Sequence, residues 1–305
     1  MSTLPAGQHA ERMVGALQSL EGLACGDAFG ERFFLPSYVA VPMILQRDVP
    51  APPWFFTDDT MMAISIVSTL KKYGEINMDF LARDFSLRYE SSRGYGPAMH
   101  NLLAEIRRGG DWKSEAQALF RGQGSFGNGS AMRVAPLGAY FADDLDLIPE
   151  QAARSAATTH CHSEAVAGAI AVAFAAGLAF LCGATRRKHD AREFLERVHE
   201  KTPESKVKEG IRKAMDLPKG TSVEKAVFAL GNGTLITCQD TVPFTLWCAA
   251  NYLQNYEEAL WARLRGLGDR DTTCAIVGGI VVGYAGVEAI PKEWLESREK
   301  LPVLS

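Results

Sequence analysis

Two short acidic segments are the parts of this sequence with the clearest capacity for chemistry. Residues 57–60 read Thr-Asp-Asp-Thr, and residues 269–272 read Asp-Arg-Asp-Thr. Each lies at the start of an apolar run with helical spacing, where aspartate is also favoured simply because the helix dipole is positive there. If the two segments meet, however, four carboxylates would share one pocket, and their mutual repulsion would be large.

A divalent cation would relieve that repulsion. An all-oxygen set of carboxylates and hydroxyls suits Mg²⁺, Mn²⁺ or Ca²⁺ and does not suit zinc. The donors are numerous enough for two ions, which in two-metal sites lie roughly 3.5–4 Å apart and clamp substrate oxygens. The sequence therefore predicts a two-ion centre, provided that the fold brings the segments together.

A glycine-rich segment, residues 122–133, is a second candidate. It reads Gly-Gln-Gly-Ser-Phe-Gly-Asn-Gly-Ser-Ala-Met-Arg and contains Gly-x-Gly-x-x-Gly. We reject a dinucleotide-binding fold, because that fingerprint follows a strand, whereas residues 114–120 have helical spacing. The glycines still let backbone N–H groups approach an anion, and a helix start behind the loop would add a positive dipole end. Phe126 would offer its ring face to a base or a sugar.

A histidine pair, His160 and His162, precedes a long apolar segment. Such a pair can bind zinc, but no third nitrogen or sulfur ligand is spaced nearby, and soft ligands do not match the acidic segments. We therefore expect His160 or His162 to donate a hydrogen bond to a substrate or to cap the following helix.

Helices must position these residues, since few segments alternate apolar and polar residues as strands do. Asp240 and Thr241 precede Pro243 and predict a helix start at that point. No linker is long or polar enough to divide the chain, so we expect one all-α domain over residues 1–305, with its core at about 12–294. Apolar residues at three- and four-residue steps occur in segments 10–23, 60–73, 78–91, 97–107, 113–120, 163–181, 191–201, 207–215, 223–230, 242–252, 256–264 and 272–287.

Composition narrows the class of protein. The net charge of −4 and the absence of a long basic block argue against a partner such as nucleic acid or an anionic membrane. Residues 165–184 could span a bilayer, but an Ala- and Gly-rich helix also suits the centre of an all-α domain, which we expect here. Six cysteines without a Cys-x-x-Cys pair, and an N-terminus without a secretory signal, predict a reduced, cytoplasmic protein.

Taken together, these segments resemble the ADP-ribosylglycohydrolases, the family that includes dinitrogenase reductase-activating glycohydrolase and the vertebrate ADP-ribosyl-acceptor hydrolases. The similarity runs from about Arg12 to Trp294, in the family's order. It comprises six motifs, at residues 22–30, 57–60, 127–133 with 135–138, 159–160, 240–247 and 268–272.

The resemblance implies an orthogonal all-α fold with a binuclear Mg²⁺ or Mn²⁺ centre that holds the ribose hydroxyls beside the scissile anomeric carbon. Asp27 would support that centre from behind. The loop of residues 125–130 would bind the diphosphate and ribose of ADP-ribose, with Phe126 on the side of the base and His160 in contact with the nucleotide. The implied metal ligands are Thr57, Asp58, Asp59, Asp269, Asp271 and Thr272, and the implied substrate-binding residues are Ser125, Phe126, Gly127, Asn128, Gly129, Ser130 and His160.

Two departures from the family pattern concern catalysis. Family members commonly carry a glutamate seven residues after the position of Asp27, where this chain has Phe34. The nearest carboxylate is Glu31, which would take that place from a different loop path, unless a ligand carboxylate or a metal-bound water fills the role. Arg270 stands between the two aspartates, where the family has a small residue or threonine; it would contact a phosphate or point to solvent.

The resemblance implies metal-dependent hydrolysis at the ribose anomeric carbon, which releases ADP-ribose from a modified acceptor. A metal-bound water would attack, Asp58 or Asp59 would take its proton, and Glu31 or solvent would protonate the leaving group. Protein arginine is the leading acceptor; serine, a nucleobase and a small ADP-ribosyl substrate stay open.

The alternatives are an ADP-ribose-binding protein without turnover, a structural member like the lens crystallins of this fold, and a hydrolase of another metal-chelating nucleotide or phosphoester. Retention of all six implied ligand positions argues against the first two. The sequence carries no signal for the oligomeric state.

Overall fold

The computed structural model describes residues 6–186 and 190–303. In these two ranges the chain is all-α, with α-helices, short 3₁₀ helices and no strand, as the sequence predicts. The α-helices are α1 (Ala6–Glu31), α2 (Ser37–Gln46), α3 (Asp58–Tyr73), α4 (Met78–Arg88), α5 (Pro97–Arg107), α6 (Trp112–Gly122), α7 (Ala135–Tyr140), α8 (Ile148–Ala157), α9 (Ser163–Thr185), α10 (Ala191–Lys201), α11 (Lys206–Asp216), α12 (Val223–Leu230), α13 (Cys238–Asn251), α14 (Tyr256–Arg265), α15 (Arg270–Ala285) and α16 (Lys292–Ser297). The 3₁₀ helices are η1 (Ser91–Arg93), η2 (Asn128–Ser130), η3 (Leu145–Leu147) and η4 (Val287–Ala289).

Each of the twelve segments with helical spacing overlaps one α-helix, and α5, α10 and α12 have the predicted bounds. Segments 78–91, 242–252 and 272–287 run past the ends of α4, α13 and α15. One predicted start is wrong: Thr237 is the N-cap of α13, so Asp240 and Thr241 lie inside that helix. The sequence analysis missed α2, α7, α8 and α16. Each has only six to ten residues and a proline inside it or at its start, which is too little for a periodic pattern to be visible.

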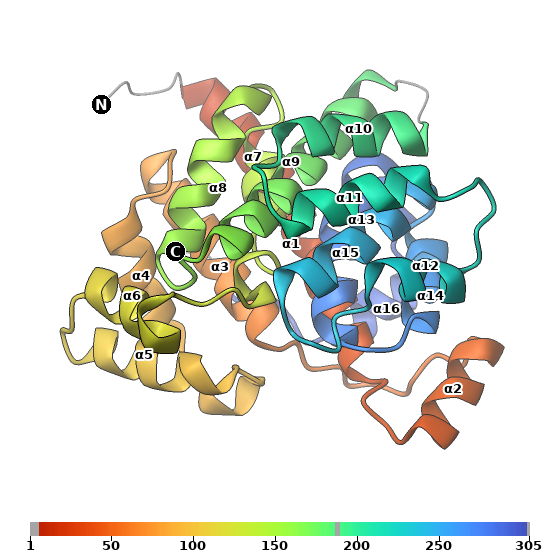
Figure 1. Ribbon diagram of the computed structural model, residues 1–305, viewed down its shortest axis with the longest axis horizontal. Coiled ribbons are helices and arrows are strands. Elements are labelled where there is room, and N and C mark those ends of the chain that lie inside the picture. Colours follow the sequence, from red (N-terminus) through yellow and green to blue (C-terminus); the bar gives the residue numbers. More distant parts are fainter. Residues whose placement is uncertain (1–5, 187–189, 304–305) are drawn as a thin grey trace.

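The apolar helix α9 belongs to the core. It is long and apolar enough to cross a membrane, but 78% of its most apolar stretch is buried inside the protein. It packs against α7, α8 and α15. In Figure 1 these helices and α1 run through the middle of the molecule, with α4–α6 on one side and α10–α12 on the other. The structure thus gives α9 the role of a central core helix.

An unusually close contact joins α1 to α15. Gly22, Gly26 and Gly30 repeat every four residues and therefore share one face of α1. A Cβ atom on Gly26 would lie 2.3 Å from the carbonyl oxygen of Cys274, and one on Gly30 would lie 2.3 Å from that of Arg270. The two helix backbones thus touch along the length of this face, and the contact fixes the start of α15 beside the end of α1.

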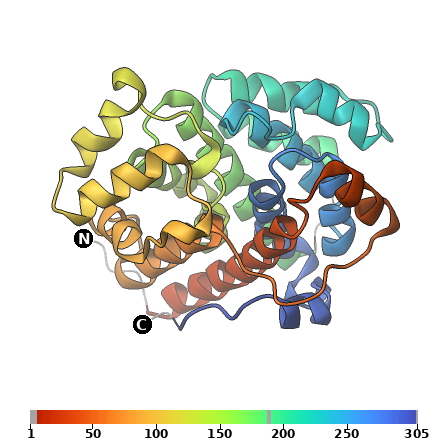
Figure 2. The ribbon, with the colours of Figure 1, turned by 90° about the horizontal axis from the view of Figure 1, so that it is seen from below.

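The helix that carries the first acidic segment, α3, also packs on α1. Figure 2 shows α1 and α3 side by side. Because α3 and α15 are both placed by α1, the fold brings their N-termini to the same part of the molecule.

The α1–α15 contact predicts the effect of one methyl group. Gly26→Ala should lower the free energy of unfolding by about 1–3 kcal/mol, because the new Cβ meets backbone atoms that cannot rotate away. Urea unfolding monitored by circular dichroism measures this change. Gly7→Ala is the matched control in the same helix: nothing lies within 4 Å of its added Cβ, so it should be neutral or stabilising by at most about 1 kcal/mol. Equal stabilities of the Gly26→Ala variant and the wild type would contradict the close contact.

Candidate active site

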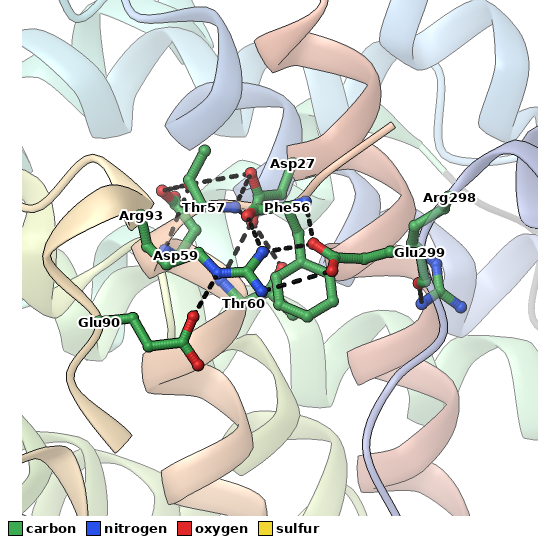
Figure 3. A network of polar contacts seen from close by, with 9 residues as sticks. All are labelled: Asp27, Phe56, Thr57, Asp59, Thr60, Glu90, Arg93, Arg298 and Glu299. Atoms are coloured by element: carbon green, nitrogen blue, oxygen red, sulfur yellow. Dashed lines mark hydrogen bonds and ion pairs between the residues drawn. The ribbon is translucent and has the colours of Figure 1, made fainter. Parts of the chain in front are cut away.

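The start of α3 is organised around one buried carboxylate, Asp27 of α1 (Figure 3). Asp27 accepts hydrogen bonds from the backbone N–H and hydroxyl of Thr57 at 2.9–3.1 Å, and from those of Thr60 at 3.1 and 2.5 Å. Thr57 is the N-cap of α3, and Asp58 and Asp59 lie in its first turn. Asp27 therefore satisfies N–H groups at the helix start and fixes where Asp58 and Asp59 lie.

The start of α15 supplies the second set of carboxylates. Asp269 is its N-cap residue and Asp271 lies in its first turn. The side-chain amide of Asn128 donates a hydrogen bond to Asp269 at 2.7 Å. The hydroxyl oxygen of Thr272 lies 3.5 Å from Oδ2 of Asp59, which is 213 positions away in the sequence. The two acidic helix starts therefore meet in the folded chain.

Their meeting crowds buried negative charges. Burial raises the pKa of Asp58 to about 8, and the charges of Asp27 and Asp269 add to the rise. Burial also raises the pKa of Asp59 well above its usual range, together with the charges of Asp27, Asp271 and Asp58. The pKa of Asp271 rises for the same reasons, burial first and then the charge of Asp269. Folding thus holds these carboxylates together against their repulsion.

One oxygen of the cluster has no partner. The hydroxyl oxygen of Thr57 lies 2.9 Å from both Oδ2 of Asp59 and Oδ1 of Asp27, and it has a single proton to donate. The other oxygen of Asp59, Oδ1, is buried and makes no hydrogen bond within the described residues. Buried polar atoms are nearly always paired. A bound cation would satisfy this atom and neutralise the carboxylates around it.

The donor chemistry fits Mg²⁺ or Mn²⁺, since every implied ligand is a carboxylate or hydroxyl oxygen. In the part of the chain that the structure describes, no three His, Cys, Asp or Glu side chains already form a closed metal-binding group. Four of the six implied ligands are aspartates, and among the described residues these carboxylates are near one another without being gathered around a single point. Crowded charge and the unpaired oxygen of Asp59 are thus the observations in favour of a metal.

A cavity of about 570 Å³ opens onto the acidic cluster, a volume in the range of sites for small ligands. Thr57 and Asp59 are buried behind its wall rather than in it. Of the residues expected at the site, the wall contains Asp58, Ser125, Phe126, Gly127, Asn128, Gly129, His160, Asp269, Asp271 and Thr272. The structure therefore brings most of the expected metal-binding and substrate-binding residues to one cavity.

The glycine-rich loop differs from the expectation in two ways. Only the three-residue 3₁₀ helix η2 follows it directly, so no α-helix dipole points at the cavity from this loop. The hydroxyl of Ser130 is buried and donates to the carbonyl of Ala165 at 2.9 Å, so it anchors the loop to α9 and is absent from the cavity wall. The loop is also held by N–H groups of Asn128 and Cys238, which bond across to residues 236 and 126.

His160 is oriented by a chain of hydrogen bonds. A guanidinium nitrogen of buried Arg133 donates to the hydroxyl oxygen of Thr159 at 2.9 Å, and that oxygen lies 2.7 Å from Nδ1 of His160. With the arginine as donor, the hydroxyl proton of Thr159 is directed to Nδ1, which leaves the proton of the ring on Nε2. Burial, followed by the charge of Arg133, lowers the pKa of His160 to about 3. His160 is therefore a neutral Nε2–H donor in the cavity wall.

The second histidine has the other expected role. Nδ1 of His162 accepts the backbone N–H of Glu164 at 3.1 Å and caps α9. The ring of His160 packs directly on Gly129. A side chain at position 129 would not fit, because its Cβ would lie 2.8 Å from Nε2 of His160. The pair thus divides the two expected roles, with His160 at the cavity and His162 at the helix start.

Glu31, the expected acid, is the last residue of α1 and is exposed. It is not part of the cavity wall. Its pKa is nevertheless raised, by partial burial and then by the negative charges of Asp27 and Asp269, so it lies within electrostatic reach of the cluster. Its catalytic role stays a prediction.

Arg270 has neither of the two roles considered for it. Its guanidinium is buried, donates to the carbonyl of Phe33 at 3.0 Å and lies 5.3 Å from the ring centre of Phe34. It therefore neither points to solvent nor lines the cavity. It links the start of α15 to the segment after α1, and Phe34 serves as its packing partner.

Sequence reasoning missed the apolar part of the cavity wall, which consists of buried Met62, Met99 and Met132 and of exposed Phe120, Leu235 and Ile236. Phe120 and Ile236 have backbone φ angles of 52° and 55°, which are uncommon for residues with side chains. Phe120 lies where α6 departs from helical geometry, although the spacing predicts helix to this point. The spacing predicts helix at Met62, Met99 and Phe120, but it does not indicate that these side chains line a cavity.

Comparison with known proteins gives a consistent result. A family model described as ADP-ribosylglycohydrolase matches residues 7–304. The chain is 29% identical to human ADP-ribosylhydrolase ARH3 over 278 residues, covering 80% of this chain and 75% of that protein. It is 32% identical over 302 residues to an uncharacterised protein of Archaeoglobus fulgidus, covering 90% and 88%.

A solved structure described as an ADP-ribosylglycohydrolase-related protein complex shares the fold. The TM-score is 0.66 at 23% sequence identity, and the superposition covers 95% of this chain and 94% of that one.

The crowded carboxylates predict that removing one of them stabilises the metal-free protein and weakens metal binding. In EDTA, Asp59→Asn should raise the free energy of unfolding by about 0.5–2 kcal/mol, because it removes one of the repelling buried charges. Mn²⁺ at about a hundred times its Kd should stabilise the wild type by about 2.7 kcal/mol and the variant far less. Urea unfolding with and without Mn²⁺ measures both effects.

Asp79→Asn is the matched control, since Asp79 occupies the same position in the first turn of α4 as Asp59 does in α3. It should gain no stability in EDTA and keep the response to Mn²⁺. A wild type indifferent to Mn²⁺, or an Asp59→Asn variant that is less stable in EDTA, would refute the interpretation of the cluster.

The hydrogen-bond chain to His160 predicts a single ring tautomer. Nitrogen-15 NMR should show His160 neutral with its proton on Nε2 and without titration between pH 5 and 8, because the lowered pKa keeps the neutral form above about pH 3. Thr159→Val removes the partner of Nδ1 and should give a mixture of tautomers. Titration of His160 near its ordinary pKa in the wild type would argue against the neutral donor.

Proposed function

Because the chain belongs to the ADP-ribosylglycohydrolase family, we propose that it hydrolyses the glycosidic bond between ADP-ribose and a modified acceptor. The observation that carries this proposal is the meeting of the two acidic helix starts at a cavity that a glycine-rich loop also lines. Six vertebrate relatives share the printed name ADP-ribosylhydrolase ARH3, which supports the same reaction class.

The proposed metal centre consists of two Mg²⁺ or Mn²⁺ ions held by the six oxygen ligands at the two helix starts. The ligands would be Thr57, Asp58, Asp59, Asp269, Asp271 and Thr272. When bound, the ions would supply Lewis-acid polarisation of the ribose hydroxyls and of water.

The residues of the chain divide the remaining work. The loop 125–129 lies in the cavity wall and would offer the ring of Phe126 to the nucleotide. The N–H groups of Gly127 and Asn128 are already bonded, to Ser125 and Ile236, and keep the loop in shape. Nε2–H of His160 donates from the same side. Met62, Met99 and Met132 form an apolar surface against which a base or sugar can pack and from which water is excluded.

In the proposed reaction the oxygen of a water forms a bond to the anomeric carbon while the bond from that carbon to the acceptor breaks. Asp58 takes the proton from the water, because it is in the cavity wall whereas Asp59 lies behind it. The acceptor leaves with a proton from Glu31 or from solvent. Asp27 holds Asp58 and Asp59 in place through Thr57 and Thr60.

The proposed acceptor is protein arginine. Serine, a nucleobase and small ADP-ribosyl compounds are the other acceptors to be tested.

All six cysteines lie in the described part of the chain and none is in a disulfide, which supports the proposed cytoplasmic location.

One observation favours a second candidate function. Glu31 is outside the cavity wall, and Phe34 packs on Arg270 where the family commonly has a glutamate. A site without a positioned acid could bind ADP-ribose without turnover. Retention of the whole acidic cluster, which is costly to keep buried, supports the enzyme over this alternative.

Release of ADP-ribose from defined substrates tests the proposal. Arginine-linked and serine-linked ADP-ribosyl proteins are incubated with the purified chain in Mg²⁺, in Mn²⁺ and in EDTA, and free ADP-ribose is measured. We expect release from the arginine-linked protein with either metal and none in EDTA. Asp58→Asn and Asp271→Asn should lower the rate about a hundredfold, and Asp79→Asn should leave it unchanged.

Release from the serine-linked protein alone would correct the acceptor and keep the reaction. Tight binding of ADP-ribose without release from any substrate would establish the binding-only alternative.

A further inference from the structure

The last part of the chain lies along the segment that leads into α3. The backbone N–H of Trp54 donates to the carbonyl of Ser297 at 2.7 Å, and that of Glu299 donates to the carbonyl of Trp54 at 2.9 Å. Figure 2 shows the chain after α16 running past α1. These bonds place Glu299 beside Phe56, the residue directly before the proposed metal ligand Thr57.

Both backbone polar groups of Phe56 are bound by one ion pair (Figure 3). The carboxylate of Glu299 accepts the N–H of Phe56 at 2.9 Å, and the guanidinium of Arg93 donates to its carbonyl at 2.9 Å. Arg93 and Glu299 also pair with each other through two hydrogen bonds, and their side chains are about one-fifth exposed. The guanidinium carbon of Arg93 lies 4.7 Å from the ring centre of Phe56, and Nε of Arg93 donates a hydrogen bond to Glu90.

The segment that follows Arg93 lines the cavity. Arg93 is followed by Gly94, which lines the cavity and would place a Cβ 3.7 Å from Oδ1 of Asp58. Gly96 and Met99, a few residues further, line it too. Arg93 thus connects the tail, the backbone before Thr57, and the cavity wall next to Asp58.

We infer that Arg93 and Glu299 form a positioning pair through which the C-terminal segment sets the metal ligands at the start of α3. This inference rests on the proposed metal centre. Neither residue touches the cavity, so both act through Phe56 and Gly94. Charge-assisted bonds of an arginine fork are directional, which suits the fixing of a backbone segment. Partners behind metal ligands typically change metal affinity by 10–100-fold when removed.

A second ion pair in the same tail provides the matched control. Arg298, the neighbour of Glu299, donates to Glu21 of α1 at 2.6 Å. This pair fastens the tail to the protein but makes no contact with Phe56. Glu299→Gln and Glu21→Gln each remove one carboxylate charge from the attachment of the tail, and only the first affects the segment before Thr57.

Titration of each metal-free full-length variant with Mn²⁺, followed by electron paramagnetic resonance, tests the inference without using activity. We expect Glu299→Gln to raise the Kd for Mn²⁺ about tenfold and Glu21→Gln to change it by less than about twofold. Arg93→Lys keeps the charge but cannot bridge Phe56 and Glu299 with one fork, so it should behave as Glu299→Gln does. Urea unfolding of the three variants separates this effect from general loss of stability.

Equal Mn²⁺ affinities in the Glu299→Gln variant and the wild type would overturn the positioning role and leave the proposed function standing. So would an equal loss in the Glu299→Gln and Glu21→Gln variants, because the tail would then act only through stability. A wild type that binds no Mn²⁺ would overturn the proposed metal centre and the positioning role together.

Discussion

The repulsion among buried carboxylates is the constraint on which the rest of this structure depends. Asp58, Asp59 and Asp271 all have raised pKa values because burial and neighbouring negative charges disfavour ionisation. No fold would gather such groups for stability alone. The protein holds them in place by two devices, the glycine face that joins α1 to α15 and the hydrogen bonds from α3 to Asp27. The first device is a contact between two helix backbones, and the second binds both backbone N–H groups and hydroxyls at the start of α3.

The cavity combines this negative cluster with surfaces of a different kind. Besides the carboxylates, the wall of the cavity contains a glycine-rich loop, the neutral ring of His160 and three methionines. A ligand with a sugar diol, an anionic linker and an aromatic base could find a matching surface for each part. This division of surfaces is why the family reaction, hydrolysis at a ribose, suits the site better than a simple phosphoester cleavage would.

The features that could be predicted from the sequence are those that a short stretch of residues shows by itself. Helical spacing located twelve helices, and the acidic segments and the glycine-rich loop stood out because each is a short run of unusual residues. Contacts between distant segments could not be read in that way. Arg270 was expected at a phosphate or in solvent, yet it packs on Phe34, whose proximity only the α1–α15 contact creates. Ser130 lies in the predicted loop, but its hydroxyl faces α9. Arg93 and Glu299 are 206 positions apart and carry no motif.

The presence of metal between the starts of α3 and α15 is the central claim, and anomalous diffraction from crystals soaked in Mn²⁺ tests it most directly. We expect anomalous peaks within ligand distance of carboxylate oxygens from both helix starts, including the unpaired Oδ1 of Asp59. A well-ordered crystal without a peak at that position, or with Mn²⁺ bound only elsewhere, would contradict it.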